Sequence, residues 1–182
     1  MTSTSKSVER FSRPKLDRKG VVLSGSCSTM TNQQVDTYKE LAASLKLDIE
    51  RVINEPSYLT EVIDWIKEHS SRPYFPLVYA TVPATELKQI QADFGSAASA
   101  AVEGLFHQLV SQLSQQEYQV FISAGGETSS TVTQALSVDR FEIGAEIAPG
   151  VPWVQSLDGQ FSLALKSGNF GDKHFFQQAQ DQ

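Results

Sequence analysis

The chain has 182 residues, 40% of them hydrophobic and 20% charged, and its formal net charge at pH 7 is −6. A chain of this size and composition suits a single domain with a sizeable core. The acidic balance excludes a general nucleic-acid binder, which needs a basic face to neutralise phosphates. No apolar run reaches the length of about 18 residues expected of a membrane span. With one cysteine and no secretory signal, we expect a soluble, cytoplasmic protein without a membrane partner.

The first 20 residues differ from the rest in charge. They hold six Lys and Arg residues against Glu9 and Asp17, a net charge of +4, so the remainder of the chain carries −10. Polar, basic segments of this kind are most often solvated linkers, and a nucleic-acid-binding arm is the alternative. We predict a linker or disordered lead-in at 1–20 and one domain at 21–182.

A unit of strand, tight loop and helix opens this domain. The short apolar run at 21–23 ends in a Ser-Gly-Ser turn, which indicates a buried strand. Thr31 and Gln34 have the spacing of a capping box, in which each side chain satisfies a backbone amide of the other residue. Apolar residues follow at helical spacing as far as Leu45 and predict a helix.

The same unit repeats through the middle of the chain. Apolar runs predict strands at 47–53, 77–82 and 118–123, and helical spacing predicts helices at 59–66, 96–113 and 128–136. The longest helix carries an apolar stripe that we assign to the core.

The hydrophobicity pattern changes in the last third of the chain. Hydrophobicity alternates at 141–147 and 161–165, a turn is expected at 149–152, and a short terminal helix includes Phe175 and Phe176. Strands that alternate with helices place the fold in the α/β class. We expect a layered domain with a central, mostly parallel sheet, helices on its faces and a β-rich C-terminal third.

Three loops rich in Gly and Ser follow three of the predicted strands. Ligands of open α/β sheets lie beyond the carboxyl ends of the strands, where such loops can present N–H groups and hydroxyls to phosphate oxygens. Each loop alone is more often a simple turn, but three at one edge favour a phosphate-bearing ligand. Neither a Walker A motif nor a dinucleotide fingerprint is present. The candidate binding residues are Ser24, Gly25, Ser26, Gly125, Gly126, Glu127, Thr128, Ser129, Lys166, Gly168 and Asn169.

Four side chains near these loops have two interpretations each. Lys166 is equally suited to pair with a phosphate and to be a surface lysine at a strand end. Glu127 complements the dipole of the helix that it begins, and its alternative role is to hold Mg²⁺ through water. Trp153 is assigned to core packing, with a base-binding slot as the alternative. Cys27 lacks a neighbouring base and is assigned to packing rather than to catalysis.

Four segments of the chain together resemble a known family. It is the nucleotide-binding C-terminal domain of the four-carbon acid sugar kinases, which include 3-oxo-tetronate, threonate and erythronate kinases. The resemblance runs from about residue 21 to the C-terminus, and Ser130 stands where the family usually has glycine. The matching segments are LSGSCS at 23–28, GGETS at 125–129, PGVPW at 149–153 and KSGNFG at 166–171.

The resemblance implies a ligand, a reaction and a partner. ATP or ADP, with Mg²⁺, is the expected ligand, and the reaction is transfer of the γ-phosphate to the 4-hydroxyl of a four-carbon acid sugar. In the family, a separate N-terminal domain holds the sugar acid and the expected base. We therefore expect no catalytic residue in this chain and no activity without that domain, in cis or in trans. A homo-oligomer is compatible with these expectations.

Two other functions stay open at this point. The first is a stand-alone nucleotide-sensing or regulatory domain that performs no chemistry, because no substrate domain is found in the first 20 residues. The second is an oxidoreductase domain with a nicotinamide or flavin cofactor, which the α/β pattern permits but the missing dinucleotide fingerprint opposes.

Overall fold

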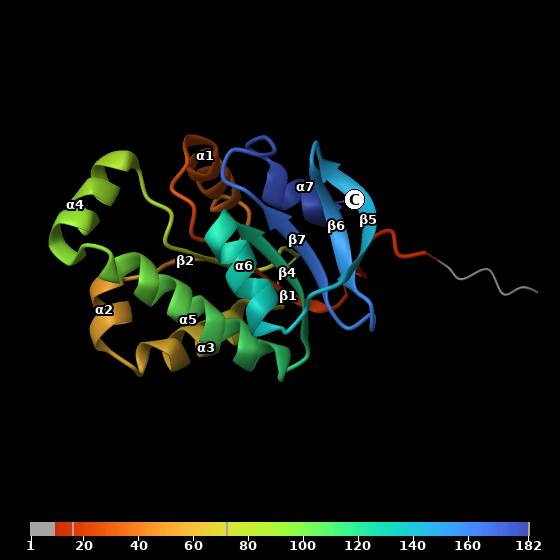
Figure 1. The fold of residues 1–182 in the computed structure, drawn as a ribbon, viewed down its shortest axis with the longest axis horizontal. Helices are drawn as coiled ribbons and strands as arrows, with labels where there is room; N and C mark the ends of the chain where they lie inside the picture. Colours follow the sequence, from red (N-terminus) through yellow and green to blue (C-terminus); the bar gives the residue numbers. More distant parts are fainter. Residues whose placement is uncertain (1–9, 16, 72, 182) are drawn as a thin grey trace, which may run out of the picture.

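The computed structural model describes residues 10–15, 17–71 and 73–181. Within these ranges the strands form one sheet of seven, in the order β2-β3-β1-β4-β7-β6-β5 (Figure 1). The strands are β1 (Lys19–Ser24), β2 (Ser44–Lys46), β3 (Leu77–Tyr79), β4 (Tyr118–Ala124), β5 (Phe141–Ala148), β6 (Val151–Ser156) and β7 (Ser162–Lys166). The helices are α1 (Thr29–Tyr38), α2 (Ile49–Asn54), α3 (Tyr58–His69), α4 (Ala84–Phe94), α5 (Ala97–Ser114), α6 (Gly126–Ala135) and α7 (Phe175–Asp181).

The sheet is parallel in its first part and antiparallel at one edge. The pairs β2–β3, β1–β3, β1–β4 and β4–β7 are parallel. The last strands, β5 and β6, pair with each other and with β7 in antiparallel fashion. The predicted α/β fold, with a mostly parallel sheet and a β-rich C-terminal third, is confirmed.

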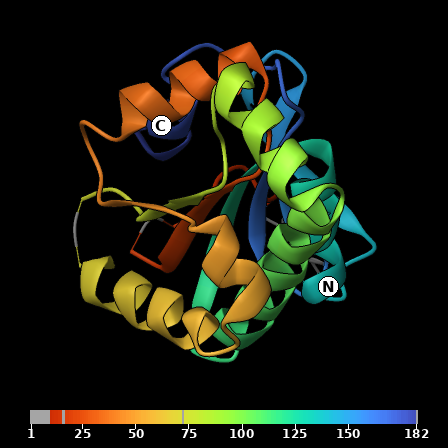
Figure 2. The ribbon, with the colours of Figure 1, turned by 90° about the vertical axis from the view of Figure 1, so that its left-hand side faces the viewer.

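The two faces of the sheet have separate hydrophobic cores. Val21 and Leu23 of β1 point to one core, whereas Val22 between them points to the other, because successive strand residues face opposite sides. Side chains of α3, α5 and α6 complete the first core, and those of α1 and α7 complete the second. Figure 2 shows these two groups of helices on opposite sides of the sheet.

The region around residue 48 departs from the sequence prediction. The strand predicted at 47–53 is wrong: β2 ends at Lys46, and α2 begins at Ile49. The apolar residues there fit both a strand and a helix, and Asp48 decides, because its carboxylate accepts a hydrogen bond of 3.2 Å from the amide of Arg51 and caps the helix. The preceding helix also ends earlier than predicted, at Tyr38.

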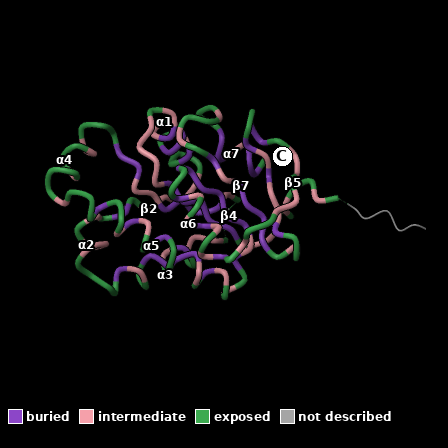
Figure 3. The backbone as a smooth tube through the Cα atoms, viewed as in Figure 1, coloured by how far each residue is buried: buried purple, intermediate pink, exposed green. Residues whose placement is uncertain are grey.

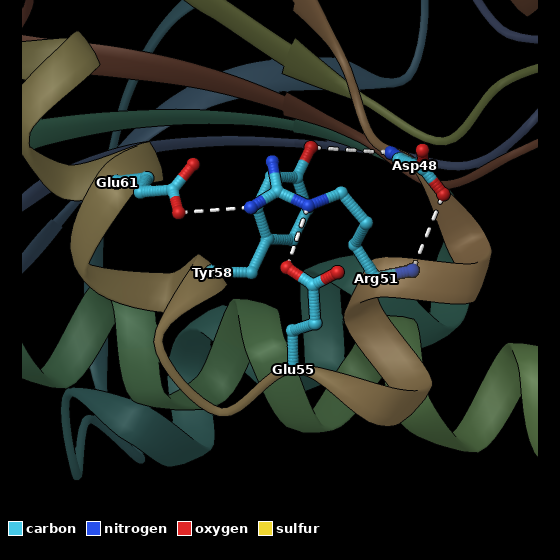
Figure 4. A network of polar contacts seen from close by, with 5 residues as sticks. All are labelled: Asp48, Arg51, Glu55, Tyr58 and Glu61. Carbon is cyan, nitrogen blue, oxygen red and sulfur yellow. Dashed lines mark hydrogen bonds and ion pairs between the residues drawn. The ribbon is translucent and has the colours of Figure 1, made fainter.

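A polar network joins α2 to α3 (Figure 4). The guanidinium of Arg51 lies over the ring of Tyr58, 4.3 Å from its centroid, and pairs with Glu55 at 2.7 Å and Glu61 at 2.8 Å. The hydroxyl of Tyr58 accepts a hydrogen bond of 3.2 Å from the amide of Asp48. Exposed ion pairs contribute little individually to the free energy of unfolding. We therefore infer that this network mainly orients α2 relative to α3.

Helix α4 was absent from the sequence prediction. None of its residues is buried, and the tube is largely exposed along it in Figure 3. Leu87, Ile90 and Phe94 lie at helical spacing along α4, and the sequence prediction did not include this stripe; all three are only half-buried. Elsewhere among the described residues, no helix is both long and apolar enough to span a bilayer.

The start of the domain also differs from the predicted boundary. Strand β1 begins at Lys19, two residues before residue 21. Further upstream, the amide of Phe11 donates to Glu142 at 3.0 Å, and the carbonyl of Ser12 accepts from the amide of Ala145 at 2.8 Å. Part of the predicted lead-in therefore lies along β5, whereas residues 1–9 and 16 are outside the described residues.

Candidate functional site

The three Gly- and Ser-rich loops converge at the carboxyl edge of three neighbouring strands. They follow β1, β4 and β7, which are adjacent in the sheet. The amide of Ser26 donates to the carbonyl of Ala124 at 3.1 Å, and the amide of Gly125 donates to the carbonyl of Lys166 at 2.8 Å. A methyl group on Gly168 would lie 3.0 Å from the hydroxyl oxygen of Ser26. The prediction that the loops share one edge is confirmed, and their binding of a phosphate stays a prediction.

Gly25 and Gly125 are required by the close contact between the first two loops. A methyl group on Gly25 would overlap the hydroxyl of Thr128 and lie 3.2 Å from Oε1 of Glu103. Gly125 has a φ of +124°, a conformation that side chains rarely adopt. Gly126 is different, because its φ is not positive and a methyl group there would meet nothing within 4 Å. Any side chain at Gly126 would enter open space at the loop edge.

The second loop continues directly into α6. Gly126 and Glu127 are exposed in the first turn, where helix amides have no intrahelical acceptor and favour an anion. The hydroxyls of the next two predicted residues are already engaged: Thr128 donates to Glu103 at 3.0 Å, and the hydroxyl oxygen of Ser129 lies 2.9 Å from that of Ser123. The exposed part of this loop is therefore Gly126 with Glu127.

The first loop places its hydroxyls in three different roles. Ser24 is fully buried and its hydroxyl oxygen lies 2.6 Å from that of Thr81, so in this structure its side chain is used inside the protein. Ser26 is half-buried, and its oxygen accepts from the amide of Ser28 at 3.2 Å. Ser28 caps α1, accepting from the amide of Thr31 at 3.1 Å.

The capping box predicted for α1 is wrong. The N-cap is Ser28, not Thr31, so the helix begins earlier than the pattern indicated. Gln34 does not reach back to the helix start. Its side-chain amide instead donates to the carbonyls of Phe170 at 3.0 Å and Asp172 at 2.9 Å. This residue therefore fixes the third loop, a role that depends on a contact with a distant part of the chain.

Of the two interpretations of Lys166, the structure excludes the surface lysine, and pairing with a phosphate stays a prediction. Lys166 is not a surface lysine, because its side chain is 0% exposed. It also does not point into solvent towards a ligand, since its Nζ lies 3.1 Å from Oγ1 of Thr31 and 2.7 Å from the carbonyl oxygen of Gly168. Burial lowers the pKa of Lys166 to about 8. In contrast to Lys166, Asn169 in the same loop is exposed.

Glu103 belongs to the site and was missed in the sequence. Its carboxylate accepts hydrogen bonds from Thr128 at 3.0 Å and Thr131 at 2.8 Å. Burial raises the pKa of Glu103, and the charge of Glu127 adds to this rise. Glu103 is the only Asp, Glu, Lys or Arg in the 18 residues of α5, and that isolation in an apolar helix was the available signal.

A small cavity of about 80 Å³, with a mixed polar and apolar lining, lies beside the first two loops. Its lining combines two residues of the first loop, Gly25 and Cys27, with the carboxylates of Glu103 and Glu127. Its volume is below the roughly 300–1,000 Å³ of typical ligand pockets, so it has room for only part of a ligand. The apolar part is formed by Ile49, Ala80, Val82, Leu87, Ile90, Ala98 and Val102.

Trp153 has no part in this site. It is 0% exposed and belongs to the core on the face of α1 and α7. Its assignment to core packing is confirmed, and the alternative of a base-binding slot is wrong. A wider, open groove of about 700 Å³ borders the third loop and includes Asn169 and Phe170 in its lining.

The fold and the three loops define the class of the protein. A parallel α/β sheet with glycine-containing loops at one edge, two of which lead into helices, is the architecture of nucleotide-binding domains. A family model described as the nucleotide-binding C-terminal domain matches residues 21–176. The chain therefore belongs to this family, as the resemblance predicted.

Similar proteins of known sequence are longer than this chain. A 3-oxo-tetronate kinase of Brucella melitensis is 52% identical over 161 residues, which are 88% of this chain and 37% of the relative. A 3-oxo-tetronate kinase of Haemophilus influenzae is 48% identical over 163 residues, 89% of this chain and 40% of the relative. The chain thus spans about two fifths of the length of the curated relatives that it matches.

Solved structures agree with the fold. The crystal structure of Haemophilus influenzae protein HI1011 superposes with a TM-score of 0.91 at 46% identity, over 97% of this chain and 43% of that protein. A Bordetella bronchiseptica protein at 16% identity has a TM-score of 0.65, which supports the fold alone.

Proposed function

We propose that this chain is the nucleotide-binding half of a kinase that phosphorylates four-carbon acid sugars. The observation that carries the proposal is the convergence of the three loops, with Gly126 open at the start of α6. Relatives named 3-oxo-tetronate kinase, 52% and 48% identical to this chain, support the reaction. Transfer from ATP to the 4-hydroxyl of the sugar acid is part of the same proposal.

In this proposal the loops bind the phosphates of ATP or ADP. Exposed amides at Gly126 and Glu127 supply N–H donors and the positive end of the α6 dipole. Gly125 and Gly25 allow the first two loops to approach each other closely enough to form one surface. The nucleoside lies towards the small cavity between α4 and α5, which begins at the first loop.

Mg²⁺ would be held mainly by the nucleotide. Glu103 and Glu127 both line the cavity beside the loops, and Mg²⁺ prefers one or two carboxylates together with phosphates and water. The described residues contain no group of three or more His, Cys, Asp or Glu side chains that could hold a metal alone. The residues present therefore fit a cation that arrives with the nucleotide and neutralises the charge of its phosphates.

The sugar acid and the catalytic base are proposed to lie in a separate domain. The chain spans 37% and 40% of two relatives, so most of their length has no counterpart here. A kinase must hold the acceptor hydroxyl in line with the γ-phosphate, and such orientation is worth roughly 7–11 kcal/mol of the barrier. Closure of two domains around both substrates would supply this orientation and exclude water.

Calorimetry with ATP or ADP and Mg²⁺ tests nucleotide binding directly. We expect a single saturable site and a higher melting temperature, because a ligand of the native state stabilises it by about 2.7 kcal/mol at a concentration of 100 Kd. For a domain of this size, the corresponding shift is roughly 5–10 °C. An unchanged thermal transition at millimolar nucleotide would exclude the proposed site.

Kinase activity is tested by adding the N-terminal part of a relative in trans. The chain alone is expected to transfer no measurable phosphate to 3-oxo-tetronate, threonate or erythronate, and the mixture is expected to restore part of the transfer. Nucleotide binding without any transfer in the mixture would favour the second candidate, a stand-alone nucleotide-sensing domain. Turnover by the chain alone would place the acceptor site within it.

A further inference from the structure

Lys166 occupies the point at which the three loops meet. It is the last residue of β7, it pairs in register with Ala124 at the end of β4, and its carbonyl accepts the amide of Gly125. Its side chain is 0% exposed, although lysines are almost never fully buried unless they are paired. A buried cation at the centre of the loops requires an explanation.

All the acceptors of the Lys166 ammonium are neutral. Its Nζ donates to Oγ1 of Thr31 at 3.1 Å, to the carbonyl of Ser167 at 2.9 Å and to the carbonyl of Gly168 at 2.7 Å. These three bonds satisfy the three protons of the ammonium, but they do not neutralise its charge.

Among the described residues, none of the charged groups on the surrounding elements compensates the charge of Lys166. The carboxylates of Asp36 on α1, Glu127 on α6 and Asp172 in the third loop make no hydrogen bond or ion pair with its Nζ, and neither does the ammonium of Lys173. The pKa of Lys166 is lowered to about 8, with burial as the cause. A buried charge without an opposite partner is costly, and an anionic ligand nearby reduces that cost.

The ammonium also determines the orientation of one peptide unit. The carbonyl of Gly168 accepts three hydrogen bonds, from Ser28 Oγ at 2.9 Å, Thr31 Oγ1 at 2.8 Å and Lys166 Nζ at 2.7 Å. The described residues have no cis peptide bond, and in a trans peptide the carbonyl and the following N–H point in opposite directions. With the carbonyl of Gly168 turned into the protein, the N–H of Asn169 is turned outward, at an exposed position of the third loop.

We propose that Lys166 is a positioning residue, which turns the Asn169 amide towards the nucleotide phosphates and adds buried positive charge beneath them without touching the nucleotide. The inference rests on the proposed nucleotide site, and it gives that site a third donor besides the amides of α6. Preorganised amides in a site of low dielectric stabilise anions more strongly than mobile groups in water. Thr31 and Ser28 contribute to the same positioning, because their hydroxyls also donate to the carbonyl of Gly168.

Proton uptake on nucleotide binding tests the charge of Lys166. Titration with MgADP at pH 8, in two buffers of different ionisation enthalpy, measures the protons that are taken up. A lysine whose pKa burial lowers to about 8 is partly deprotonated at that pH, so we expect the unmutated chain to take up a fraction of a proton per nucleotide. Affinity should fall as the pH rises through 8. Binding without proton uptake would overturn the inference, and this measurement needs no variant to fold.

Two variants separate positioning from a general structural role. Lys166→Met, which keeps the length of the chain and removes the charge, should bind MgADP at least tenfold more weakly and without proton uptake. Its amide spectrum should change at Asn169. Lys173→Met is the matched control, because Lys173 is exposed in the same loop, and it should resemble the unmutated chain.

The outcomes also distinguish this inference from the proposed function. An unmutated chain that does not bind MgADP would refute the nucleotide site, and with it the role of Lys166. An unmutated chain that binds, together with a folded Lys166→Met variant of equal affinity, would refute the role of Lys166 alone.

Discussion

The hydroxyl of Thr128 donates a hydrogen bond of 3.0 Å to Glu103 and thereby joins the first turn of α6 to α5. Thr131, one turn further along α6, donates to the other oxygen of the same carboxylate at 2.8 Å. The start of α6, where the second loop ends, is therefore held from the neighbouring helix. Burial raises the pKa of Glu103 despite both bonds, so folding favours the protonated form of this side chain.

Glu103→Gln should stabilise the chain at neutral pH. The folded-state pKa of Glu103 lies above its ordinary value of 4.5, so the contribution of this group to stability is complete below pH 4.5 and is lost as the pH rises through the folded-state pKa. The glutamine substitution removes the titration and keeps an acceptor for one threonine, while its NH2 group can donate to the hydroxyl oxygen of the other. Because the group is half-buried, we expect a gain of less than about 1 kcal/mol, or roughly 1–3 °C in Tm.

Thermal unfolding of both proteins at pH 7.5 and pH 4 checks this prediction. The difference in Tm should be present at the higher pH and close to zero at the lower one. A variant that is less stable than the parent at pH 7.5 would mean that the Glu103 carboxylate is favourable there, in contradiction to the raised pKa.

Gly25→Ala should destabilise the contact between the first two loops. The added methyl group would overlap the hydroxyl of Thr128, and such overpacking typically costs about 1–3 kcal/mol. Thr128→Ala removes that hydroxyl, and it should restore part of the loss when the two changes are combined. Urea unfolding of the four proteins measures the coupling, which we expect to be about 1 kcal/mol. Purely additive effects would show that the two residues do not meet as described.

Gly126→Val should abolish nucleotide binding and leave the fold intact. A side chain at this position enters open space beside the proposed phosphate site, and the φ of Gly126 is not positive, so the backbone needs no change. We expect a loss of affinity of at least tenfold by calorimetry, with a nearly unchanged Tm. Gly104→Ala is the matched control, since Gly104 is also a helical glycine with free space around it.

The control has an expected result of its own. Gly104→Ala should raise the stability by about 0.5–1 kcal/mol, because alanine favours the helix, and it should leave nucleotide affinity unchanged. Full nucleotide affinity in a folded Gly126→Val variant would show that the phosphates do not bind at the second loop.

Ser28→Ala should weaken both the fold and the third loop. The Ser28 side chain caps α1 and also donates to the carbonyl of Gly168 at 2.9 Å. Loss of the cap costs typically about 1 kcal/mol, and the freed carbonyl should reduce nucleotide affinity. Ser57→Ala is the control, because Ser57 stands at the N-cap of α3 and its side chain makes no cap hydrogen bond. Equal Tm values for the two variants would contradict the capping role of Ser28.

The spacing of apolar residues was sufficient to predict those helices and strands in which it follows a single, strong period. The apolar stripe at 96–113 predicted α5 to within one residue at each end, and the buried runs at 21–23 and 118–123 predicted the cores of β1 and β4. Around residue 48 the spacing of the apolar residues fits both a strand and a helix, and the strand predicted there is wrong. Helix α4 carries a short apolar stripe of Leu87, Ile90 and Phe94, each only half-buried, and the sequence prediction missed it.

By itself, the sequence determined the α/β class, the family, and the presence of three loops suited to a phosphate. These depend on hydrophobic period and on short motifs, which are local properties of the chain. Only the tertiary structure decided what each side chain does there. Thr31 contacts Lys166 and Gly168 from a distant part of the chain, and Lys166 is fully buried. Glu103 likewise reaches Thr128 from another helix. Such roles arise from contacts between distant segments and from burial, which the order of residues does not specify locally.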